Sequence, residues 1–387
     1  MQTKKTMTVV FSILLFLISS TALSSFAMAN NASGPAPRFE SRMVYDKQNN
    51  QTILFGGGNF DSSPIELETT WLFSSQSQSW IGLNNITSPG ARWSHSMVYN
   101  SLTGKVLLFG GYSTVHSTRV NDMWEFDPST NVWTELHPVA SPSSRSHHAM
   151  YFDPIFNEII LFGGYLNGDT LSDETWIYNC TANNWNQIDP AIHPSERYGH
   201  TFAYDESLQT GVFFGGKEHG NLKSETWLFN RTSSTWSVRY VSAPQARYGT
   251  SIVYNPIDAN FILFGGDNGY SPIGAIDDTW VLNATSYVWT RITTTTNPPP
   301  RTAHAIVFDR YLGRVLLFGG YGEDYTRIFG DFWNFDPVTE IWSQDFNSAS
   351  EESSISIWIL LLGFFSIASI TRLSKFPLLR QKLRKTN

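Results

Sequence analysis

The sequence contains a single cysteine, Cys180, among 387 residues, so no disulfide can form within the chain. Stability must therefore come from a packed core rather than from covalent cross-links. Charged residues are scarce too, at 15 %, which equals the share of aromatic residues. Residues 30–354 show no sustained 3.6-residue period, which argues against long amphipathic helices. This balance is typical of an all-β protein in which aromatic rings fill the space between sheets.

Positive charge is missing from the middle of the chain. Residues 30–354 hold all 33 acidic residues but only 18 of the 26 basic ones, since two basic residues precede this segment and six follow it, which leaves a formal charge of −15. Such a surface repels the phosphates of nucleic acids and anionic lipid headgroups. Nucleic acid is therefore excluded as a partner.

The first 29 residues resemble a secretory signal peptide. Lys4 and Lys5 precede the apolar run 9–18, and the small-x-small sequence Ala27-Met28-Ala29 ends the segment. These are the three parts of a cleavable leader, so we expect residues 1–29 to be removed on export. The alternative is an uncleaved anchor helix.

The other end of the chain contains an apolar run followed only by basic residues. Residues 355–371 carry no charge, and at about 1.5 Å per residue a helix of this length just crosses a hydrocarbon core. No acidic residue follows it, and six basic ones do. We therefore expect a linker at 346–354, a single transmembrane helix at 355–371 and a cytoplasmic tail at 372–387, with the body outside the cell or in the secretory lumen. The alternative is a sorting signal that is exchanged for another anchor.

One pattern occurs six times between these ends, with a period of about 52 residues. Each copy has an arginine, a hydrophobic run that ends in a glycine pair 18 residues later, then a first tryptophan, and a second tryptophan nine residues after the first. The second copy predicts four short strands, because its β-branched and alternating runs are separated by Asn, Asp, Pro and Gly turns. These runs are 94–99, 105–111, 123–127 and 132–136.

The order Arg-x-x-His, hydrophobic strand, Gly-Gly, Trp and Trp resembles the kelch repeat. The resemblance covers residues 38–345 and implies a six-bladed β-propeller with one repeat per blade. The expected blades are 38–83, 92–137, 145–190, 197–241, 247–293 and 301–345. Each blade begins at a first strand and ends after a fourth, so closure between blades 6 and 1 is expected to rely on packing, although residues 30–37 could add a strand.

The periodic arginines invite an anion-binding interpretation, because a ring of them could surround a channel. The sequence favours structural pairing instead, since five copies also place an acidic residue two positions before the first tryptophan. The arginines are Arg38, Arg92, Arg145, Arg197, Arg247 and Arg301, and the acids are Asp122, Glu174, Glu225, Asp278 and Asp331. The first copy has Thr69 instead, beside Glu68.

Two further repeated features could suggest ligands. The glycine pairs lack the helix N-terminus that a phosphate loop needs, so we expect them to allow an unusual backbone turn and the close approach of an aromatic ring. The histidines of Arg-x-x-His, replaced by Ser41 and Thr250 in two copies, are expected to share a hydrogen-bonding role. No metal site and no cofactor are predicted.

Six N-glycosylation sequons occur, of which Asn31 is too near the processed end to weigh. Asn179, Asn230 and Asn283 each follow a first tryptophan by three residues, which places them in the turn between third and fourth strands at the outer edge. Asn50 lies in the turn between first and second strands, and the remaining sequon is Asn85. We expect such glycans to coat the periphery and to leave the loops after the glycine pairs free.

Those loops differ between copies, and rigid scaffolds usually place recognition on such loops. Tyrosine with acidic and basic side chains suits a protein or glycan surface. The candidate binding residues are Phe60, Asp61, Tyr112, His116, Arg119, Tyr165, Asp169, Lys217, His219, Asp267, Tyr270, Tyr321, Asp324, Tyr325 and Arg327. The sequence thus favours a membrane-anchored, non-catalytic binding module.

The alternative is a propeller enzyme that acts on carbohydrate. Chemistry like that of galactose oxidase needs copper and a tyrosine cross-linked to cysteine, which the single Cys180 in an outer turn disfavours. Hydrolysis or isomerisation would need a carboxylate beside a general acid or nucleophile. Asp324 with Tyr325, or Glu218 with His219, are the pairs that the loops offer.

Overall fold

The computed structural model describes residues 34–59, 68–83, 87–113, 115–269, 274–322 and 327–344. The chain divides into two units, Met1–Asp345 and Phe346–Asn387, and all described residues lie in the first. The described residues contain no helix that is long and apolar enough to cross a membrane. The expected signal peptide, linker, transmembrane helix and tail lie outside the described residues and remain predictions.

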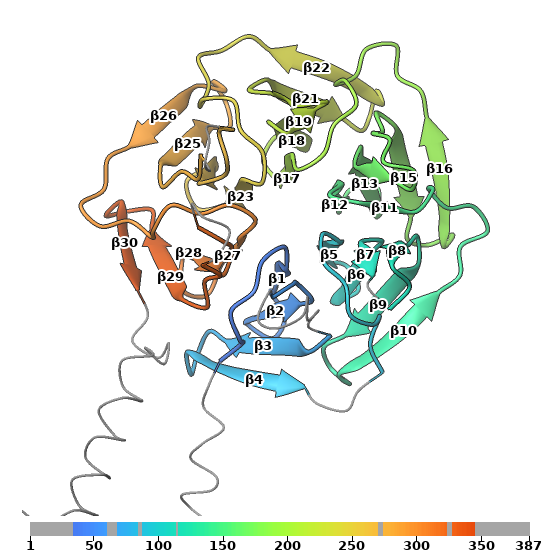
Figure 1. The fold of residues 1–387 in the computed structure, drawn as a ribbon, viewed down its shortest axis with the longest axis horizontal. Coiled ribbons are helices and arrows are strands. Elements are labelled where there is room, and N and C mark those ends of the chain that lie inside the picture. Colours follow the sequence, from blue (N-terminus) through green and yellow to red (C-terminus); the bar gives the residue numbers. More distant parts are fainter. Residues whose placement is uncertain are drawn as a thin grey trace, which may run out of the picture. The chain divides into compact units, whose positions relative to one another are not determined.

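Six four-stranded antiparallel sheets surround a central axis, which confirms the all-β, six-bladed propeller (Figure 1). Strand order within each blade follows the chain, with the first strand nearest the axis and the fourth at the rim. Blades 1 and 2 are β1 (Arg42–Asp46), β2 (Gln51–Phe55), β3 (Thr70–Ser74), β4 (Ser79–Leu83) and β5 (Ser96–Asn100), β6 (Lys105–Phe109), β9 (Met123–Asp127), β10 (Val132–Leu136). Blades 3 and 4 are β12 (Ala149–Asp153), β13 (Glu158–Phe162), β15 (Thr175–Asn179), β16 (Asn184–Ile188) and β17 (Thr201–Asp205), β18 (Thr210–Phe214), β21 (Thr226–Asn230), β22 (Thr235–Arg239). Blades 5 and 6 are β23 (Ser251–Asn255), β24 (Asn260–Phe264), β25 (Thr279–Asn283), β26 (Trp289–Ile292) and β27 (Ala305–Asp309), β28 (Arg314–Phe318), β29 (Phe332–Asp336), β30 (Ile341–Gln344).

The antiparallel order gives the propeller two distinct faces. On one, which we call the loop face, lie the loops between second and third strands and the connections between blades. These loops contribute three two-stranded sheets: β7 (Tyr112–Ser113) with β8 (Thr118–Arg119), β11 (Arg145–Ser146) with β14 (Tyr165–Leu166), and β19 (Lys217–Glu218) with β20 (Asn221–Leu222). The opposite face, which we call the turn face, carries the tight turns between first and second and between third and fourth strands.

The described sequons all lie on the turn face. Asn179, Asn230 and Asn283 end the third strands β15, β21 and β25, and each side-chain carbonyl accepts hydrogen bonds from the turn that follows. Asn50 differs from the expected peripheral position, because its turn joins the two innermost strands, β1 and β2, and therefore lies near the axis. Asn85 lies outside the described residues. A glycan on any of these four asparagines would leave the loop face uncovered.

The apolar core is divided among the interfaces between blades. One cluster combines Val98 and Phe109 of blade 2 with Ile159, Leu161 and Trp185 of blade 3, and five similar clusters fill the other interfaces. The second tryptophans contribute here: the indole N–H of Trp289 donates 3.0 Å to the hydroxyl of Thr226 in the preceding blade. Because each blade shares its core with both neighbours, no blade buries its apolar surface alone.

The ring closes without a shared blade. Blade 6 and blade 1 pack through a common apolar cluster that includes Met43 and Phe318. Hydrogen bonds add to this packing, from the Arg38 N–H to the Phe329 carbonyl (3.2 Å) and from the Gly320 N–H to the Arg38 carbonyl (2.8 Å). Residues 34–37 form no strand, so each described blade is built from one repeat alone.

Candidate functional site

The five acid-bearing repeats pair their arginine with the acid before the first tryptophan. Arg247 donates to both carboxylate oxygens of Asp278, at 2.5 and 2.9 Å, and Asp278 also accepts the indole N–H of Trp280 at 2.7 Å. The other pairs are Arg92–Asp122, Arg145–Glu174, Arg197–Glu225 and Arg301–Asp331. These guanidinium groups are buried and occupied inside the blades, so they do not form a free anion-binding ring.

Arg38 of blade 1 differs, as its repeat predicted. Its guanidinium donates to the carbonyl oxygens of Ala36 (3.0 Å) and Gly56 (3.1 Å), and it forms no ion pair with a described carboxylate. Burial lowers the pKa of Arg38 to about 9. Part of the following loop lies outside the described residues.

The glycine pairs join each blade to the next repeat's arginine. In blade 2, Gly110 and Gly111 have φ of +64° and +104°, and the Gly111 N–H donates 2.9 Å to the carbonyl of Arg145. A Cβ on Gly110 would lie 2.8 Å from that carbonyl oxygen. The ring of His148 also lies 3.1 Å from this Cβ position, so both the neighbouring backbone and the expected aromatic ring require glycine here.

A closed ring of six backbone hydrogen bonds surrounds the axis at the loop face. It is formed by the residues two positions after the periodic arginines, all with φ between 52° and 64°. Each N–H donates to the carbonyl of the equivalent residue in the preceding blade, at 2.8 to 3.1 Å, and blade 1 donates back to blade 6. The six residues are Glu40, Ser94, His147, Gly199, Gly249 and Ala303. The ring is polar over blades 1 to 3 and nearly side-chain-free over blades 4 to 6.

The polar half of the ring forms a Ser–His–Glu cluster. Nε2 of His147 lies 3.0 Å from the Ser94 hydroxyl and 3.1 Å from the Glu40 carboxylate, and the Ser94 hydroxyl also donates to Glu40. Burial alone would raise the pKa of Glu40, but the charge and hydrogen bonds of His147 and Ser94 bring it below its ordinary value. A nucleophilic triad needs the acid on the opposite ring nitrogen from the serine. Ser146, 3.0 Å from Nδ1 of His147, does lie opposite Glu40, but Ser146 is 1 % exposed and its hydroxyl accepts from Arg119 (3.2 Å), so it is not open to a substrate.

Aromatic side chains form two arcs around this cluster. In blades 6, 1 and 2, Phe39 contacts Tyr321 edge-on (5.5 Å), and Trp93 stacks on Tyr112 (5.1 Å, 13° between planes). The other arc, in blades 3 to 5, consists of Tyr165, Tyr198 and Tyr248, with centroids 4.3 and 5.9 Å apart. Trp93, Tyr112, Tyr165, Tyr198 and Tyr248 are all partly exposed.

The structure brings several of the predicted loop residues together. Arg119 pairs with Asp169 of the next blade (3.1 Å) and lies over the ring of Tyr165 (5.1 Å). Lys217 lies over Tyr248 (4.8 Å), whereas His219 turns to Glu196 (2.5 Å). His116 is exposed in the β7–β8 turn, and Arg327 lies over Phe329 (4.9 Å).

Other predicted residues are not available on this face. Asp267 and Tyr321 are buried, at 3 % and 9 % exposure, where Asp267 accepts from the Tyr248 hydroxyl and Tyr321 packs on Phe39. Their placement supports the fold rather than ligand contact. Phe60, Asp61, Tyr270, Asp324 and Tyr325 lie outside the described residues.

Sequence reasoning missed the residues that directly follow the arginines. Trp93, Tyr198 and Tyr248 come one position later, and the hydrogen-bonded ring comes two positions later. A signal was present, because the segment is otherwise constant and Trp93 is one of only two tryptophans among 14 that fall outside the repeat. Attention to variation beside the constant arginine would have found them.

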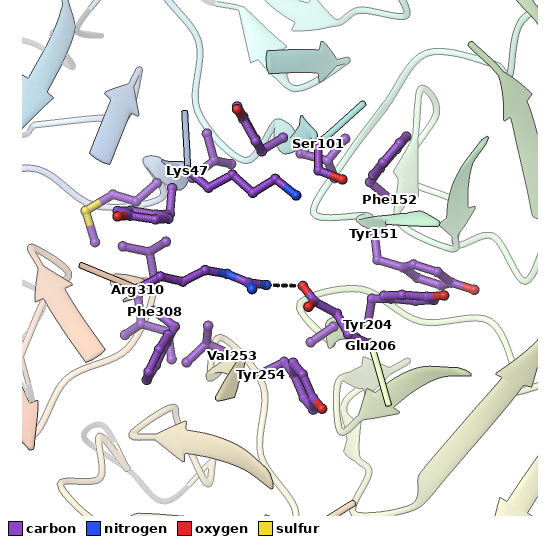
Figure 2. A pocket seen from close by; sticks show the side chains of 18 of the residues that line it. Lys47, Ser101, Tyr151, Phe152, Tyr204, Glu206, Val253, Tyr254, Phe308 and Arg310 are labelled. Carbon is purple, nitrogen blue, oxygen red and sulfur yellow. Dashed lines mark hydrogen bonds and ion pairs between the residues drawn. The ribbon is translucent and has the colours of Figure 1, made fainter. Parts of the chain in front are cut away.

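The turn face carries the wider mouth of a central channel, with a cavity of about 270 Å³ (Figure 2). The aromatic residues near the ends of the first strands line it, and the turn residues Lys47, Glu206 and Arg310 reach its opening. Arg310 of blade 6 and Glu206 of blade 4 form an ion pair across the opening. This mouth therefore combines aromatic walls with charged side chains at its opening.

The histidines of Arg-x-x-His do not form the shared hydrogen-bonding set that we expected. Nε2 of His200 lies 3.1 Å from the Phe162 carbonyl and the Thr250 hydroxyl donates to Phe264, but both ring nitrogens of His95 and His148 have no hydrogen-bond partner. Burial lowers the pKa of all four histidines, to about 3 for His200 and His304. Within the described ranges, no group of three His, Cys, Asp or Glu residues could hold a metal ion.

Cys180 lies in the turn between β15 and β16, as expected, but it is half-buried against the core of blades 2 and 3. Burial raises the pKa of its thiol to about 12. The thiol is therefore protonated at neutral pH.

Comparison with known proteins agrees with the six-bladed propeller fold. The family model for the KLHDC2/KLHL20/DRC7 Kelch-repeats domain matches residues 6–203 and 207–356, and an Attractin/LZTR1 beta-propeller model matches 137–273. Similar proteins include Mei4-dependent protein 6 of Schizosaccharomyces pombe (24 % identical over 83 % of this chain and 51 % of that protein) and an F-box/kelch-repeat protein of Arabidopsis thaliana (27 %, over 55 % and 48 %). Human Kelch domain-containing protein 3 is 22 % identical over 62 % of this chain and 67 % of its own length. The chain spans about half the length of the first two.

Proposed function

The chain belongs to the kelch-repeat β-propeller family, and from this premise we propose that it is a non-catalytic module whose loop face binds another protein. The observation that carries the proposal is the pair of aromatic arcs around the Glu40–Ser94–His147 cluster. Partly exposed tyrosine and tryptophan supply apolar contact area and a polar handle at once, which is typical of interface anchors.

The distribution of other groups supports the same face. The four described sequons lie on the turn face, so glycans there would not cover the arcs. Arg119, Asp169 and Lys217 stand at the rim of the arcs and offer charges of both signs for orientation. A protein surface with mixed charges complements this arrangement better than a polyanion does, given the acidic body.

Catalysis is the weaker alternative for the described residues. The Ser94–His147–Glu40 cluster has serine and acid on one imidazole nitrogen, and the loop residues Glu218 and His219 face different partners, Lys223 and Glu196. His147 does contact two serine hydroxyls, but Ser94 shares its nitrogen with the acid, and both Ser94 and Ser146 are buried, at 0 % and 1 % exposure. Neither arrangement therefore presents an accessible nucleophile with a base and an acid in line.

We further propose, from the sequence, that the propeller is held outside the cell or in the secretory lumen by residues 355–371. A chain that ends at residue 354 should then be released from the membrane fraction, and co-purification of both chains with membranes would contradict this anchor.

The binding proposal can be tested with the full-length chain. A displayed peptide library and a glycan array would each be screened, and the affinity of a selected ligand measured for Trp93→Ala and Tyr198→Ala. We expect a peptide ligand, and at least a tenfold loss of affinity in both variants at unchanged melting temperature. The matched control is Tyr311→Ala, because Tyr311 is 54 % exposed in the β27–β28 turn on the opposite face.

The controls separate the alternatives. A ligand lost in Tyr311→Ala but kept in both loop-face variants would refute the assignment to the loop face. Selection of a glycan alone would replace the protein partner by a sugar, and turnover of that sugar would favour the enzyme.

A further inference from the structure

One side chain breaks the symmetry of the channel wall. Arg42 is the first residue of β1, and the equivalent position of every other first strand holds a small residue. These residues are Ser96, Ala149, Thr201, Ser251 and Ala305. A single guanidinium therefore occupies space that five small residues leave open around the axis.

The charge of Arg42 is weakly compensated. Arg42 forms no ion pair with any described carboxylate. Its Nη1 group donates a hydrogen bond to the Ser41 carbonyl at 3.2 Å. Burial lowers the pKa of Arg42, while the negative charge of Glu40 raises it. After burial, the cation also contributes to the lowered pKa of His95, His148, His200 and His304, and at His95 its contribution exceeds that of the repeat's own Arg92.

Arg42 borders a cavity of about 130 Å³ in the middle of the channel. That is well above the roughly 10–15 Å³ of such space that one water molecule needs. His148 and His200 also line the cavity, at 1 % and 5 % exposure, and neither nitrogen of His148 nor Nδ1 of His200 has a hydrogen-bond partner. Neutral imidazole carries one N–H. In His200 this N–H is Nε2, which donates to the Phe162 carbonyl, so of the two histidines His148 alone offers the cavity an unused donor beside the Arg42 cation.

We propose that this cavity binds one small oxyanion of the size of phosphate or sulfate, held by the Arg42 guanidinium and oriented by the N–H of His148. Guanidinium presents parallel N–H groups that match two oxygens of such an anion. Entry is from the turn face, where the cavity of Figure 2 continues into the channel through Met43, Ile252 and Ile306, which line both. Lys47 at that mouth attracts anions, since Arg310 is already paired with Glu206. Arg42 and His200 also line a cavity of about 40 Å³ beside Glu40, Ser94 and His147, so the site borders the loop-face cluster but not the aromatic arcs.

The experiment is calorimetric titration of the full-length chain with sodium phosphate, sodium sulfate and sodium chloride at constant ionic strength. We expect one site for phosphate or sulfate, with affinity at least tenfold lower in Arg42→Gln. Arg314→Gln is the matched control, because this substitution also removes one guanidinium charge. Arg314 lies on β28 outside the channel, where it pairs with Asp336 at 3.7 Å. Its affinity should stay within twofold of the unchanged chain.

Ala149→Leu keeps the charge and fills part of the cavity, so it should also weaken binding and serves if Arg42→Gln fails to fold. Equal affinity in Arg42→Gln and the unchanged chain, or no oxyanion binding in the unchanged chain, would overturn the proposal. Preference for chloride over both oxyanions would overturn the assigned class of anion.

Discussion

Each glycine pair holds two successive residues in a left-handed backbone conformation. The first glycine lies against the arginine carbonyl of the next blade, and the second lies against the backbone of its own repeat. Gly164 shows both demands, with φ of +102° and a Cβ position only 2.7 Å from the Ser146 carbonyl oxygen. Gly168, four residues later, has φ of +87° but open space around its Cβ position. Substitutions at Gly164 and Gly168 therefore distinguish the cost of backbone strain from the cost of steric overlap.

Gly168→Ala should cost roughly 1–2 kcal/mol, the usual penalty of a left-handed L-residue. Gly164→Ala should cost clearly more, because the same strain is joined by a clash with a carbonyl that belongs to the fixed strand-start segment. Urea unfolding of both variants measures the difference. Equal losses would show that the backbone around Gly164 relaxes freely.

The arginine–acid pairs have a second test at the same scale. Asp278 is 9 % exposed and satisfies both Arg247 and Trp280, whereas Glu225 is 39 % exposed against Arg197. Asp278→Ala should lower the free energy of unfolding by about 3–5 kcal/mol, because it leaves a buried guanidinium without its counter-charge. Glu225→Ala should cost much less, since the 39 % exposed carboxylate leaves a place that water can fill beside Arg197, which is itself 1 % exposed. The comparison fails if both substitutions lower the unfolding midpoint by the same amount.

Between elements, the last two residues of the first strands are matched from blade to blade. Where a first strand ends in aspartate, the next blade has tyrosine one position earlier, as in Asp46 with Tyr99 (2.8 Å) and Asp153 with Tyr204 (3.3 Å). Where it ends in asparagine, the next blade has phenylalanine, as in Asn100 with Phe152 and Asn255 with Phe308. The hydroxyl is present only where a carboxylate can accept from it.

This matching predicts coupling between neighbouring blades. Tyr99→Phe and Asp46→Asn should each destabilise the propeller, and their combination should cost less than the sum, with a coupling of about 1 kcal/mol. The control cycle pairs Asp46→Asn with Tyr254→Phe in blade 5, which should be additive. Thermal unfolding of the six proteins decides, and additivity in the first cycle would show that the hydroxyl contact contributes nothing.

For the whole molecule, the four buried histidines make stability depend on pH. Their folded pKa values lie below the ordinary 6.5, at about 3 for His200 and His304, because burial disfavours the charged ring. Between pH 3 and pH 6.5 the unfolded chain binds more protons than the folded one. The histidines therefore leave the free energy of unfolding undiminished above pH 6.5 and lower it as the pH falls toward 3.

Each histidine should contribute a slope of about 1.4 kcal/mol per pH unit in this window. Blade 5 supplies the matched replacement, since Thr250 occupies the equivalent position with its hydroxyl bonded to the Phe264 carbonyl. His304→Thr should therefore fold and show a shallower loss of stability between pH 6 and about 4. Denaturant titrations across this range measure the slope, and an unchanged slope would place the titrating groups elsewhere.

The sequence by itself determined the repeat, the four strands of each blade and the phase of arginine and acid, because these depend on spacing within about 50 residues and recur six times. Tertiary structure alone decided what meets at the axis. Arg42, the Glu40–Ser94–His147 cluster and the aromatic arcs combine residues from different blades, and sequence distance carries no information about which side chains face one another across a closed ring. Burial was equally hidden: Tyr321 and Tyr112 stand in equivalent loops, yet one is packed beneath Phe39 and the other is partly exposed beside Trp93. Their different environments arise because Tyr112 stacks on Trp93, which follows its own repeat's arginine, whereas Tyr321 packs on Phe39, which follows the arginine of the next blade around the ring.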